Sequence, residues 1–450
     1  MIISFQRRII FMLLILASSC SSSGHPKDAG MNEGGERTDT GCDGSAGADT
    51  DSDADTDADA AADAAALNDA SVAFELTVLN GYGSGIYSAG ERVHVWSGAR
   101  PCQEVVTQWE GDAEVLERPG EWHTALLMPS RDVTLQAVVE ERDDVFEEIT
   151  FTGSTRTGKT IIYSIPRPAR GLILMLHGTS GSARMIEGEE ARYIALYALA
   201  YGYGVLAPEA EEAAAGDLNQ DDKIRWDPSL SYQNMDFANL DMLMEYLYGQ
   251  NIIEAGTPLY VLGMSNGGAM SVSLGAISAS SVADDFPNLR FNAAVCFCAS
   301  GRASSAAIST TPTAWLLCAN DDNEQVSNDA AAENSAALVS RGIDTLLDQH
   351  PASPLYSERF TRVPGVNREL SLAVAGELRA AGFVDEEGVF LTPTVAIMSQ
   401  VEEDTDSFPA ALSLGPGTLK AVVDQIRVMQ AEHQLYSDWT ARALDFISSH

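Results

Sequence analysis

The sequence predicts an α/β domain, built on a mostly parallel sheet covered by helices, preceded by a small all-β domain. From about residue 146 to residue 450, short apolar runs alternate with helical patterns, which is typical of a parallel sheet flanked by helices. Residues 73–142 instead alternate apolar and polar side chains with a period of two, which predicts half-buried strands. Ahead of both parts lies an acidic segment that predicts no packed structure.

The net charge restricts the partners. The 450 residues hold 27 Lys+Arg and 65 Asp+Glu, a formal net charge of −38. Residues 25–70 contribute 2 − 13 = −11, and residues 71–450 contribute 23 − 52 = −29. So acidic a chain repels phosphate backbones and anionic lipid surfaces, which argues against nucleic-acid binding and against electrostatic docking to a membrane. The net charge of residues 71–450 also disfavours polyanionic substrates.

A targeting signal is expected at residues 1–19. Arg7 and Arg8 precede an apolar run at 9–16, and small residues then lead to Cys20. This order resembles the lipobox of bacterial lipoproteins, in which the signal peptide is removed and the cysteine is diacylated. The resemblance implies a lipid anchor on Cys20 and a place in the cell envelope, at the outer membrane or cell surface.

Plain secretion with cleavage near Ser19 is the alternative to a lipid anchor. In either case residues 20–72 read as a disordered acidic linker, because aspartates that alternate with small residues bury too little surface to offset the entropy of ordering. Lipid and linker together would hold a folded body away from a membrane.

The β domain expected at residues 73–142 has its own pattern. Phe74, Leu76 and Val78 open an alternating strand, Trp109 follows in the middle, and a Met-Pro…Asp-Val-Thr-Leu stretch closes the unit at 128–135. These pieces resemble the bacterial β-repeat of internalin-like surface proteins. The resemblance implies a spacer or adhesion module, and Trp109 is expected in the core.

The α/β domain is expected at 146–450. Strands are predicted at residues 172–176, 204–207, 259–264, 293–298 and 313–318. Helices are predicted at residues 185–201, 234–248 and 267–277. A long insertion at about 344–431 carries a helical pattern at 369–381 and no catalytic signal, and it could form a cap over a site.

A candidate nucleophile lies between a predicted strand and a predicted helix. Gly263-Met264-Ser265-Asn266-Gly267 is a G-x-S-x-G motif, which is weak alone. Here its serine falls at the strand-to-helix junction, where a sharp turn exposes the hydroxyl and glycines permit close backbone approach. This arrangement resembles the nucleophile elbow of the α/β-hydrolase superfamily, so an α/β-hydrolase fold is expected.

A serine hydroxyl needs a base, and the base needs an acid to orient it. In the α/β-hydrolases the order along the chain is nucleophile, acid, base. The strand at 313–318 runs directly into Asp321 and Asp322. Asp321 matches the usual spacing of the family and is the expected acid, with Asp322 in reserve.

Only three histidines follow that acid. His433 stands just before an amphipathic terminal helix, where the family has its base, and it is the expected base. His350 is the alternative, although its place before Pro351 suggests a solvated capping residue at the end of a helix. His450 is the last residue and is expected to fray.

The oxyanion hole is assigned by the same resemblance. The strand at 172–176 ends in His177-Gly178-Thr179. In this fold the loop after that strand donates one amide and the residue after the nucleophile donates the other, which implies Thr179 and Asn266. His177 is expected to shape the loop rather than act as a base.

The sequence around Ser265 closely resembles the polyhydroxybutyrate depolymerase and feruloyl or acetyl-xylan esterase branch of the superfamily. The similarity extends over residues 171–274 and again over residues 433–450. The resemblance implies a secreted serine esterase that needs no cofactor and no metal. The alternatives are a non-catalytic surface lipoprotein with a degenerate hydrolase domain, and a peptidase or thioesterase of the same fold. The ester and the oligomeric state stay unassigned.

Three further features have open interpretations. Trp226 follows a predicted strand end on the side where such sites open, so it lines a substrate pocket or packs in the core. The acidic loop that begins at Asp217 is half of a calcium-loop pattern or simply a solvated loop. Cys296, Cys298 and Cys318 lie in neighbouring predicted strands, where a disulfide is possible and buried thiols are the alternative.

Overall fold

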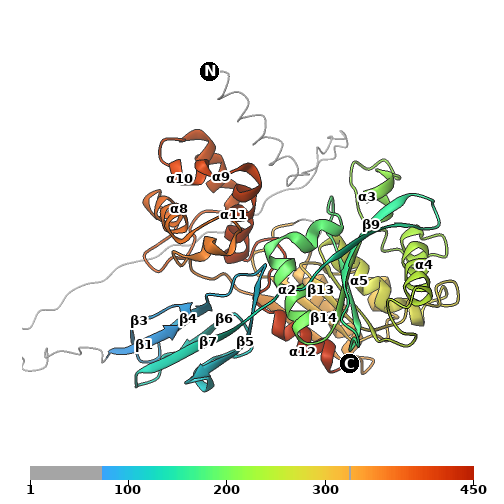
Figure 1. Ribbon diagram of the computed structural model, residues 1–450, viewed down its shortest axis with the longest axis horizontal. Coiled ribbons are helices and arrows are strands. Elements are labelled where there is room, and N and C mark those ends of the chain that lie inside the picture. Colours follow the sequence, from blue (N-terminus) through green and yellow to red (C-terminus); the bar gives the residue numbers. More distant parts are fainter. Residues whose placement is uncertain (1–72, 324–325) are drawn as a thin grey trace, which may run out of the picture. The chain divides into compact units, whose positions relative to one another are not determined.

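The computed structural model describes residues 73–323 and 326–450 (Figure 1). These residues belong to one compact unit, Val72–His450. The expected signal peptide, Cys20, Cys42 and the acidic linker lie outside the described residues. Among the residues that the structure describes, no helix is long and apolar enough to cross a membrane.

The N-terminal part is an all-β domain of two small sheets. One sheet has the strand order β3-β1-β7-β5 and the other β2-β4-β6. The strands are β1 Ala73–Leu79, β2 Gly81–Tyr82, β3 Gly85–Ser88, β4 Arg92–Ser97, β5 Glu104–Gly111, β6 His123–Leu127 and β7 Val133–Glu141. The alternating side chains Leu76 and Val78 point into the core, and Trp109 is buried there as expected, because apolar residues at every second position share one face.

The second sheet has eight strands in the order β15-β14-β13-β12-β10-β11-β9-β8. The strands are β8 Glu147–Thr152, β9 Gly158–Ser164, β10 Leu172–Leu176, β11 Gly204–Pro208, β12 Leu259–Met264, β13 Phe291–Phe297, β14 Thr313–Cys318 and β15 Thr345–His350. β8 and β9 form an antiparallel pair at one edge, and the strands from β11 to β15 are parallel. This order and these directions are those of the α/β-hydrolase fold, so the expected fold class is confirmed.

Helices cover both faces of this sheet. They are α2 Glu189–Ala200, α3 Glu211–Ala215, α4 Met235–Gly249, α5 Asn266–Ala276, α6 Ala303–Ala306, α7 Asn328–Val339 and α12 Thr440–Ser448. Apolar residues of α2 and α12 share one core with Ile173 and Met175 of β10. The neighbouring Leu172 and Leu174 point to the opposite face and pack with α4 and α5. Each fully buried leucine or isoleucine contributes about 1.5–3 kcal/mol, so this two-sided strand anchors the loop that follows it.

The insertion forms a helical group with its own core. Its helices are α8 Arg368–Ala380, α9 Thr394–Glu403, α10 Pro409–Ser413 and α11 Pro416–Met429, which lie together in Figure 1, with a 3₁₀ turn at Arg359–Arg362. Phe360, Val374, Phe408 and Ile426 lie in their shared core.

The start of the insertion differs from the expectation. Residues Thr345–His350 form β15, the edge strand of the large sheet, and pair in parallel with β14. His350 therefore ends a strand and not a helix, and it is 2% exposed. The two leucines at 346 and 347 suit a helix as well as a strand, so local propensity does not separate the two states. Pairing with β14, a tertiary contact, decides it.

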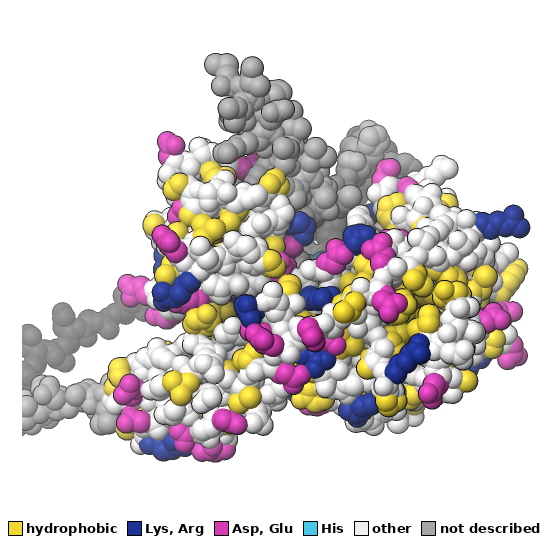
Figure 2. Space-filling model, in the orientation of Figure 1, with side chains coloured by type: hydrophobic (Ala, Val, Ile, Leu, Met, Phe, Trp, Pro, Cys, Tyr) yellow, Lys and Arg dark blue, Asp and Glu magenta, His cyan; other side chains and the backbone are white. Residues whose placement is uncertain are grey.

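Charges are mixed over the folded surface. Figure 2 shows acidic and basic side chains interspersed on the face drawn, and hydrophobic side chains around α4. Met235, Met242 and Tyr246 on α4 are 39% to 43% exposed. The excess of acid among residues 71–450 is therefore not confined to one patch on this face.

The β domain and the α/β domain share a core. A single cluster of buried apolar residues runs from Trp122 of the β domain to Leu444 of α12. The Trp122 indole donates a hydrogen bond to Ser437 Oγ at 3.2 Å, and the Val106 amide donates to the Tyr193 hydroxyl at 3.2 Å. The spacer or adhesion role of such repeats stays a prediction, but this domain is packed against its neighbour rather than suspended from it.

Glu121 fixes the first turn of α12 from the β domain. Its two carboxylate oxygens accept hydrogen bonds from the amides of Ala441, at 3.0 Å, and Arg442, at 2.8 Å. Such amides at a helix N-terminus lack partners within the helix. Burial raises the pKa of Glu121 to about 8, against the lowering effect of these two amides.

This raised pKa predicts a pH-dependent stability. Between pH 4.5 and 8 the folded protein holds a proton on Glu121 that the unfolded chain releases, so the free energy of unfolding should fall as pH rises through this window. One group contributes at most about 1.4 kcal/mol per pH unit. In Glu121→Gln this contribution is absent, and urea unfolding at pH 5, 6, 7 and 8 should give a flatter dependence than wild type. The exposed change Glu110→Gln is the control; equal slopes in wild type and Glu121→Gln would contradict the assignment.

Candidate active site

Ser265 occupies a strained turn between β12 and α5. Its backbone has φ 56° and ψ −120°, a left-handed conformation that non-glycine residues rarely adopt. A Cβ on Gly263 would lie 2.1 Å from the Gly267 carbonyl oxygen, and one on Gly267 would lie 2.3 Å from the Leu176 carbonyl oxygen. Only glycine fits at either position, because these backbones approach so closely. The G-x-S-x-G spacing thus builds the turn that presents the hydroxyl.

Three side chains form a continuous hydrogen-bonded chain. His433 Nε2 lies 2.9 Å from Ser265 Oγ, and His433 Nδ1 lies 2.8 Å from Asp321 Oδ2. Because an ionised carboxylate only accepts, Nδ1 carries the proton and Nε2 is left to accept from the serine. The Asp321 side chain is 1% exposed and the His433 ring 19% exposed, so the acid is enclosed while the base is reached from outside.

The loops that carry the acid and the base are tied to one another. The Asn320 amide donates to the Ala431 carbonyl at 3.0 Å, and the Asn320 side chain donates to the Gln430 carbonyl at 2.8 Å. Asp321 Oδ1 accepts from the Asn323 amide at 3.0 Å, which orients the carboxylate. The end of β14 and the loop after α11 are thereby fixed together.

The other acids and histidines considered from sequence lie elsewhere. Asp322 is exposed, so of the two neighbouring acids it is Asp321 that contacts the imidazole. His350 is buried beside Asp438, and His450 pairs with Asp344 at 3.3 Å. Of the histidines in the described part of the chain, it is His433 that is hydrogen-bonded to Ser265 Oγ.

Two backbone amides in the segments beside Ser265 have no hydrogen-bond acceptor within the described part of the chain. Neither the Thr179 nor the Asn266 backbone N–H donates a hydrogen bond to any residue that the structure describes. A Cβ on Gly178 would lie 3.4 Å from Ser265 Cβ, so the loop after β10 borders the nucleophile. Asn266 is the first residue of α5, where the partial positive charge of a helix N-terminus favours a developing oxyanion.

His177 supports the loop after β10. The Ala210 amide donates to its Nε2 at 3.1 Å, so Nδ1 carries the proton and donates to the Gly178 carbonyl at 2.8 Å. Burial lowers the pKa of His177 to about 4. The ring is therefore neutral at physiological pH and, with both nitrogens engaged, serves the shape of the loop.

Trp226 packs in the core and bridges the two amide-bearing segments. It is 1% exposed, and its indole N–H donates to the His177 carbonyl at 3.0 Å. Its backbone N–H donates to Asn266 Oδ1 at 2.7 Å, and Asn266 Nδ2 donates to the Trp226 carbonyl at 3.1 Å. Of the two interpretations of this residue, the burial supports core packing and not pocket lining. The bridge itself has no sequence signal beyond the place of Trp226 after β11.

The acidic loop after Gly216 uses its carboxylates on its own backbone. Asp217 accepts hydrogen bonds from the amides of Gln220 and Asp222, both at 2.7 Å, and Asp221 is paired with Arg225. Among the described residues, the cluster with metal-ligand spacing is His123, His350 and Asp438, away from this loop. The solvated-loop interpretation fits these bonds.

Two buried thiols lie close to the backbone of the residue that follows His433. Cys298 and Cys318 have their sulfurs 3.0 Å apart, and they lie 3.3 Å and 3.6 Å from the carbonyl of Gln434, the residue after His433. Burial raises the pKa of Cys298 well above its ordinary value, which keeps a thiol protonated and poorly nucleophilic. Both are free thiols in this structure, and Cys296 is a third.

Comparisons with known proteins find only weak structural similarity. Neither a family model nor a curated protein matches the sequence. An esterase from Pyrococcus furiosus is 13% identical over 46% of this chain and 83% of its own, with a TM-score of 0.34. A cold-adapted esterase from an Arctic intertidal metagenomic library is 16% identical over 47% and 87%, with a TM-score of 0.33. An acetyl xylan esterase from Paenibacillus sp. R4 is 11% identical over 46% and 77%, with a TM-score of 0.31. The fold assignment rests on the order and direction of the strands.

Proposed function

We propose that this protein is a serine hydrolase that cleaves carboxylic esters, with Ser265 as nucleophile, His433 as base and Asp321 as the acid that orients it. The observation that carries the proposal is the chain of hydrogen bonds from Asp321 through His433 to Ser265, at 2.8 Å and 2.9 Å, on a strained turn. A nucleophile within hydrogen-bond reach of an oriented base is the arrangement that covalent catalysis requires.

The reaction would run in two steps. His433 Nε2 takes the proton of Ser265 as the hydroxyl attacks the ester carbonyl, and the amides of Thr179 and Asn266 stabilise the oxyanion. The tetrahedral intermediate collapses, the imidazolium gives its proton to the leaving alcohol, and an acyl-serine remains. Water then attacks the acyl group with His433 again as base, which releases the acid and restores the serine.

The proposed substrate class is based on the net charge of the folded residues and on the expected location of the protein. The net −29 on residues 71–450 repels polyanions, so a neutral small or polymeric ester is the proposed substrate. The order Arg7, Arg8, apolar run, Cys20 supports export and a lipid anchor on Cys20, which would put the enzyme in the cell envelope. Cell fractionation of wild type and Cys20→Ala tests this part separately.

The experiment that tests the activity is labelling with a fluorophosphonate, which reacts with activated serines. The folded wild type should be labelled at Ser265, and Ser265→Ala should lose both the label and ester hydrolysis, with kcat/KM lower by at least about 10³-fold. Ser340→Ala, at the end of α7, is the matched control and should label like wild type.

The outcome also separates the alternatives. A folded wild type that takes no label would favour a binding protein with a degenerate hydrolase domain. Labelled protein that prefers peptides or thioesters over p-nitrophenyl esters in kcat/KM would favour a peptidase or thioesterase of the same fold.

A further inference from the structure

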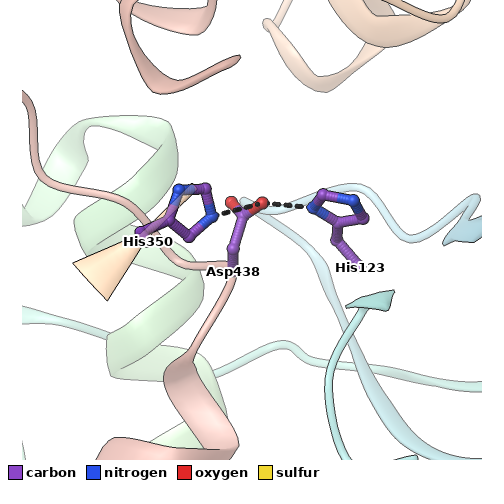
Figure 3. A group of neighbouring side chains, drawn as sticks. All are labelled: His123, His350 and Asp438. Carbon is purple, nitrogen blue, oxygen red and sulfur yellow. Dashed lines mark hydrogen bonds and ion pairs between the residues drawn. The ribbon is translucent and has the colours of Figure 1, made fainter. Parts of the chain in front are cut away.

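Three ionisable side chains meet where the β domain contacts the α/β domain. His123 Nδ1 lies 2.5 Å from Asp438 Oδ2, and His350 Nε2 lies 3.2 Å from the same oxygen. The three residues are 8%, 1% and 2% exposed for His123, Asp438 and His350. Figure 3 shows the two rings on opposite sides of the carboxylate, which projects from the segment that leads into α12. They come from β6, the end of β15 and the residue before Trp439, so the cluster joins three distant parts of the chain.

A neighbouring arginine fixes the direction of the hydrogen bonds. Arg92 can only donate, and its Nη1 lies 3.0 Å from His94 Nε2, which must accept. Burial, followed by the neighbouring His123, lowers the pKa of His94 to about 3, so the His94 ring is neutral and carries its proton on Nδ1. His94 Nδ1 therefore donates to His123 Nε2 at 3.0 Å, and His123 Nδ1 donates to Asp438.

The carboxylate at the end of this chain is ionised. Burial opposes ionisation, but His350 and His123 hold the pKa of Asp438 well below its ordinary range. Asp438 Oδ2 thus has a donor from the β domain and a ring from the end of β15, while Asp438 Oδ1 is buried with no hydrogen-bond partner among the described residues. Removal of one partner would leave a buried charge with a missing hydrogen bond, which is costly in a protein interior.

The same geometry argues against a metal ion. The three ligand atoms lie within 4.8 Å of one another, close enough to converge on a cation. A cation bound to His123 Nδ1 would leave the His123 proton on Nε2, which would then donate to His94 Nδ1. His94 would in turn carry its proton on Nε2, and this N–H would point at the N–H groups of Arg92, which can only donate. Burial first, and then the positive charge of the buried Arg359 among other groups, lowers the pKa of His123, and the same charge would oppose a cation there. The donors are arranged for a carboxylate and not for a cation.

Asp438 belongs to the segment that carries the proposed base. His433 precedes it by five residues, and the segment between is held on both sides. Ser437 Oγ donates to Glu190 at 2.6 Å and accepts from the Trp122 indole at 3.2 Å. The Tyr436 hydroxyl donates to the Leu317 carbonyl at 3.2 Å, one residue before the end of β14. Contacts from the β domain therefore end on the loop that positions His433.

We propose that the β domain is a positioning part of the hydrolase: His123 holds Asp438, and through it the segment 433–438, so that His433 stays between Ser265 and Asp321. This inference rests on the proposed function. His123 and Asp438 act through His433 and touch no reacting atom, so they are positioning residues. Their loss should lower the rate of the chemical step more than substrate binding, because the substrate site itself is left in place.

The test compares two substitutions at one position. His123→Leu removes the donor to Asp438, whereas His123→Asn keeps an N–H near the place of Nδ1. His123→Leu should lower kcat for a p-nitrophenyl ester by about 10- to 100-fold with KM within about twofold, and His123→Asn should recover most of that loss. Glu110→Gln, on the exposed side of the β domain, is the matched control and should behave like wild type.

Stability and metal content are measured on the same proteins. Circular dichroism and thermal unfolding show whether each variant is folded at the assay temperature. If His123→Leu is not folded, Asp438→Asn is compared with wild type instead, since asparagine keeps the shape of the side chain and removes its charge. Elemental analysis of the purified wild type should find no stoichiometric zinc.

The outcomes are distinct. An unchanged kcat in a folded His123→Leu or Asp438→Asn, or equal losses in His123→Leu and His123→Asn, would overturn the positioning role. Stoichiometric zinc that His123→Leu loses would replace it with a metal site. A wild type that neither hydrolyses esters nor reacts with the fluorophosphonate would overturn the proposed function first, and this inference with it.

Discussion

Replacement of Asp321 by asparagine is expected to lower kcat for an ester substrate by about 10⁴-fold, while the fold is kept. The asparagine amide can present an N–H to His433 Nδ1, whereas in the wild type Nδ1 donates its proton to Asp321 Oδ2 at 2.8 Å. The imidazole would then carry its proton on Nε2, on the side of Ser265, and could not accept the serine proton. Steady-state kinetics at several pH values measure the loss.

The neighbouring acid supplies the control for this experiment. Asp322 is exposed, so Asp322→Asn should leave kcat within about twofold of wild type. A large loss in Asp322→Asn together with a small loss in Asp321→Asn would show that the other carboxylate orients the base, and the geometry of the acid loop would have to be revised.

Gly263→Ala is expected to lower the free energy of unfolding more than any other substitution proposed for this protein. The new Cβ would lie 2.1 Å from the Gly267 carbonyl oxygen, which is backbone of the same turn and cannot move without displacing Ser265. We expect a loss of more than about 3 kcal/mol in the free energy of unfolding, or failure to fold, and no fluorophosphonate label. Urea denaturation and labelling measure the two effects.

Gly376→Ala is the matched glycine control. Gly376 lies within α8, and a Cβ there meets nothing within 4 Å. Alanine in a helix interior should stabilise the protein by about 0.5–1 kcal/mol, because glycine loses more backbone entropy on folding. If Gly263→Ala were as stable as Gly376→Ala and still labelled, the close approach at the elbow would be refuted.

The sequence predicted the elements that have local signals. The central strands from β10 to β14 consist mainly of apolar residues, as a sheet covered on both faces requires. Once the strands are located, the residues that follow their ends can be identified. Ser265, Asp321 and His433 were therefore assigned by their order along the chain, and the structure brings them within hydrogen-bond distance.

The contacts between distant segments had no such signal. His123 and Asp438 are 315 residues apart, and nothing near either one indicates the pairing. The same holds for the bridge that Trp226 makes to Asn266, 40 residues away. β15 was missed because its leucines suit either state and only the partner strand decides. Local patterns thus locate the strand ends, whereas the supports around them depend on tertiary packing.

The interface between the β domain and α12 also affects the order in which parts of the chain can fold. The side of the β domain that contains Trp122 and Glu121 is covered by Ser437, which lies 315 residues after Trp122, and by the first turn of α12. A chain synthesised from its N-terminus would leave this apolar surface uncovered until residues 437–442 have been added. Contacts so far apart in sequence form late and slow the search for the native state. Removal of α12 would therefore expose a surface of the β domain, more than 300 residues away in the sequence.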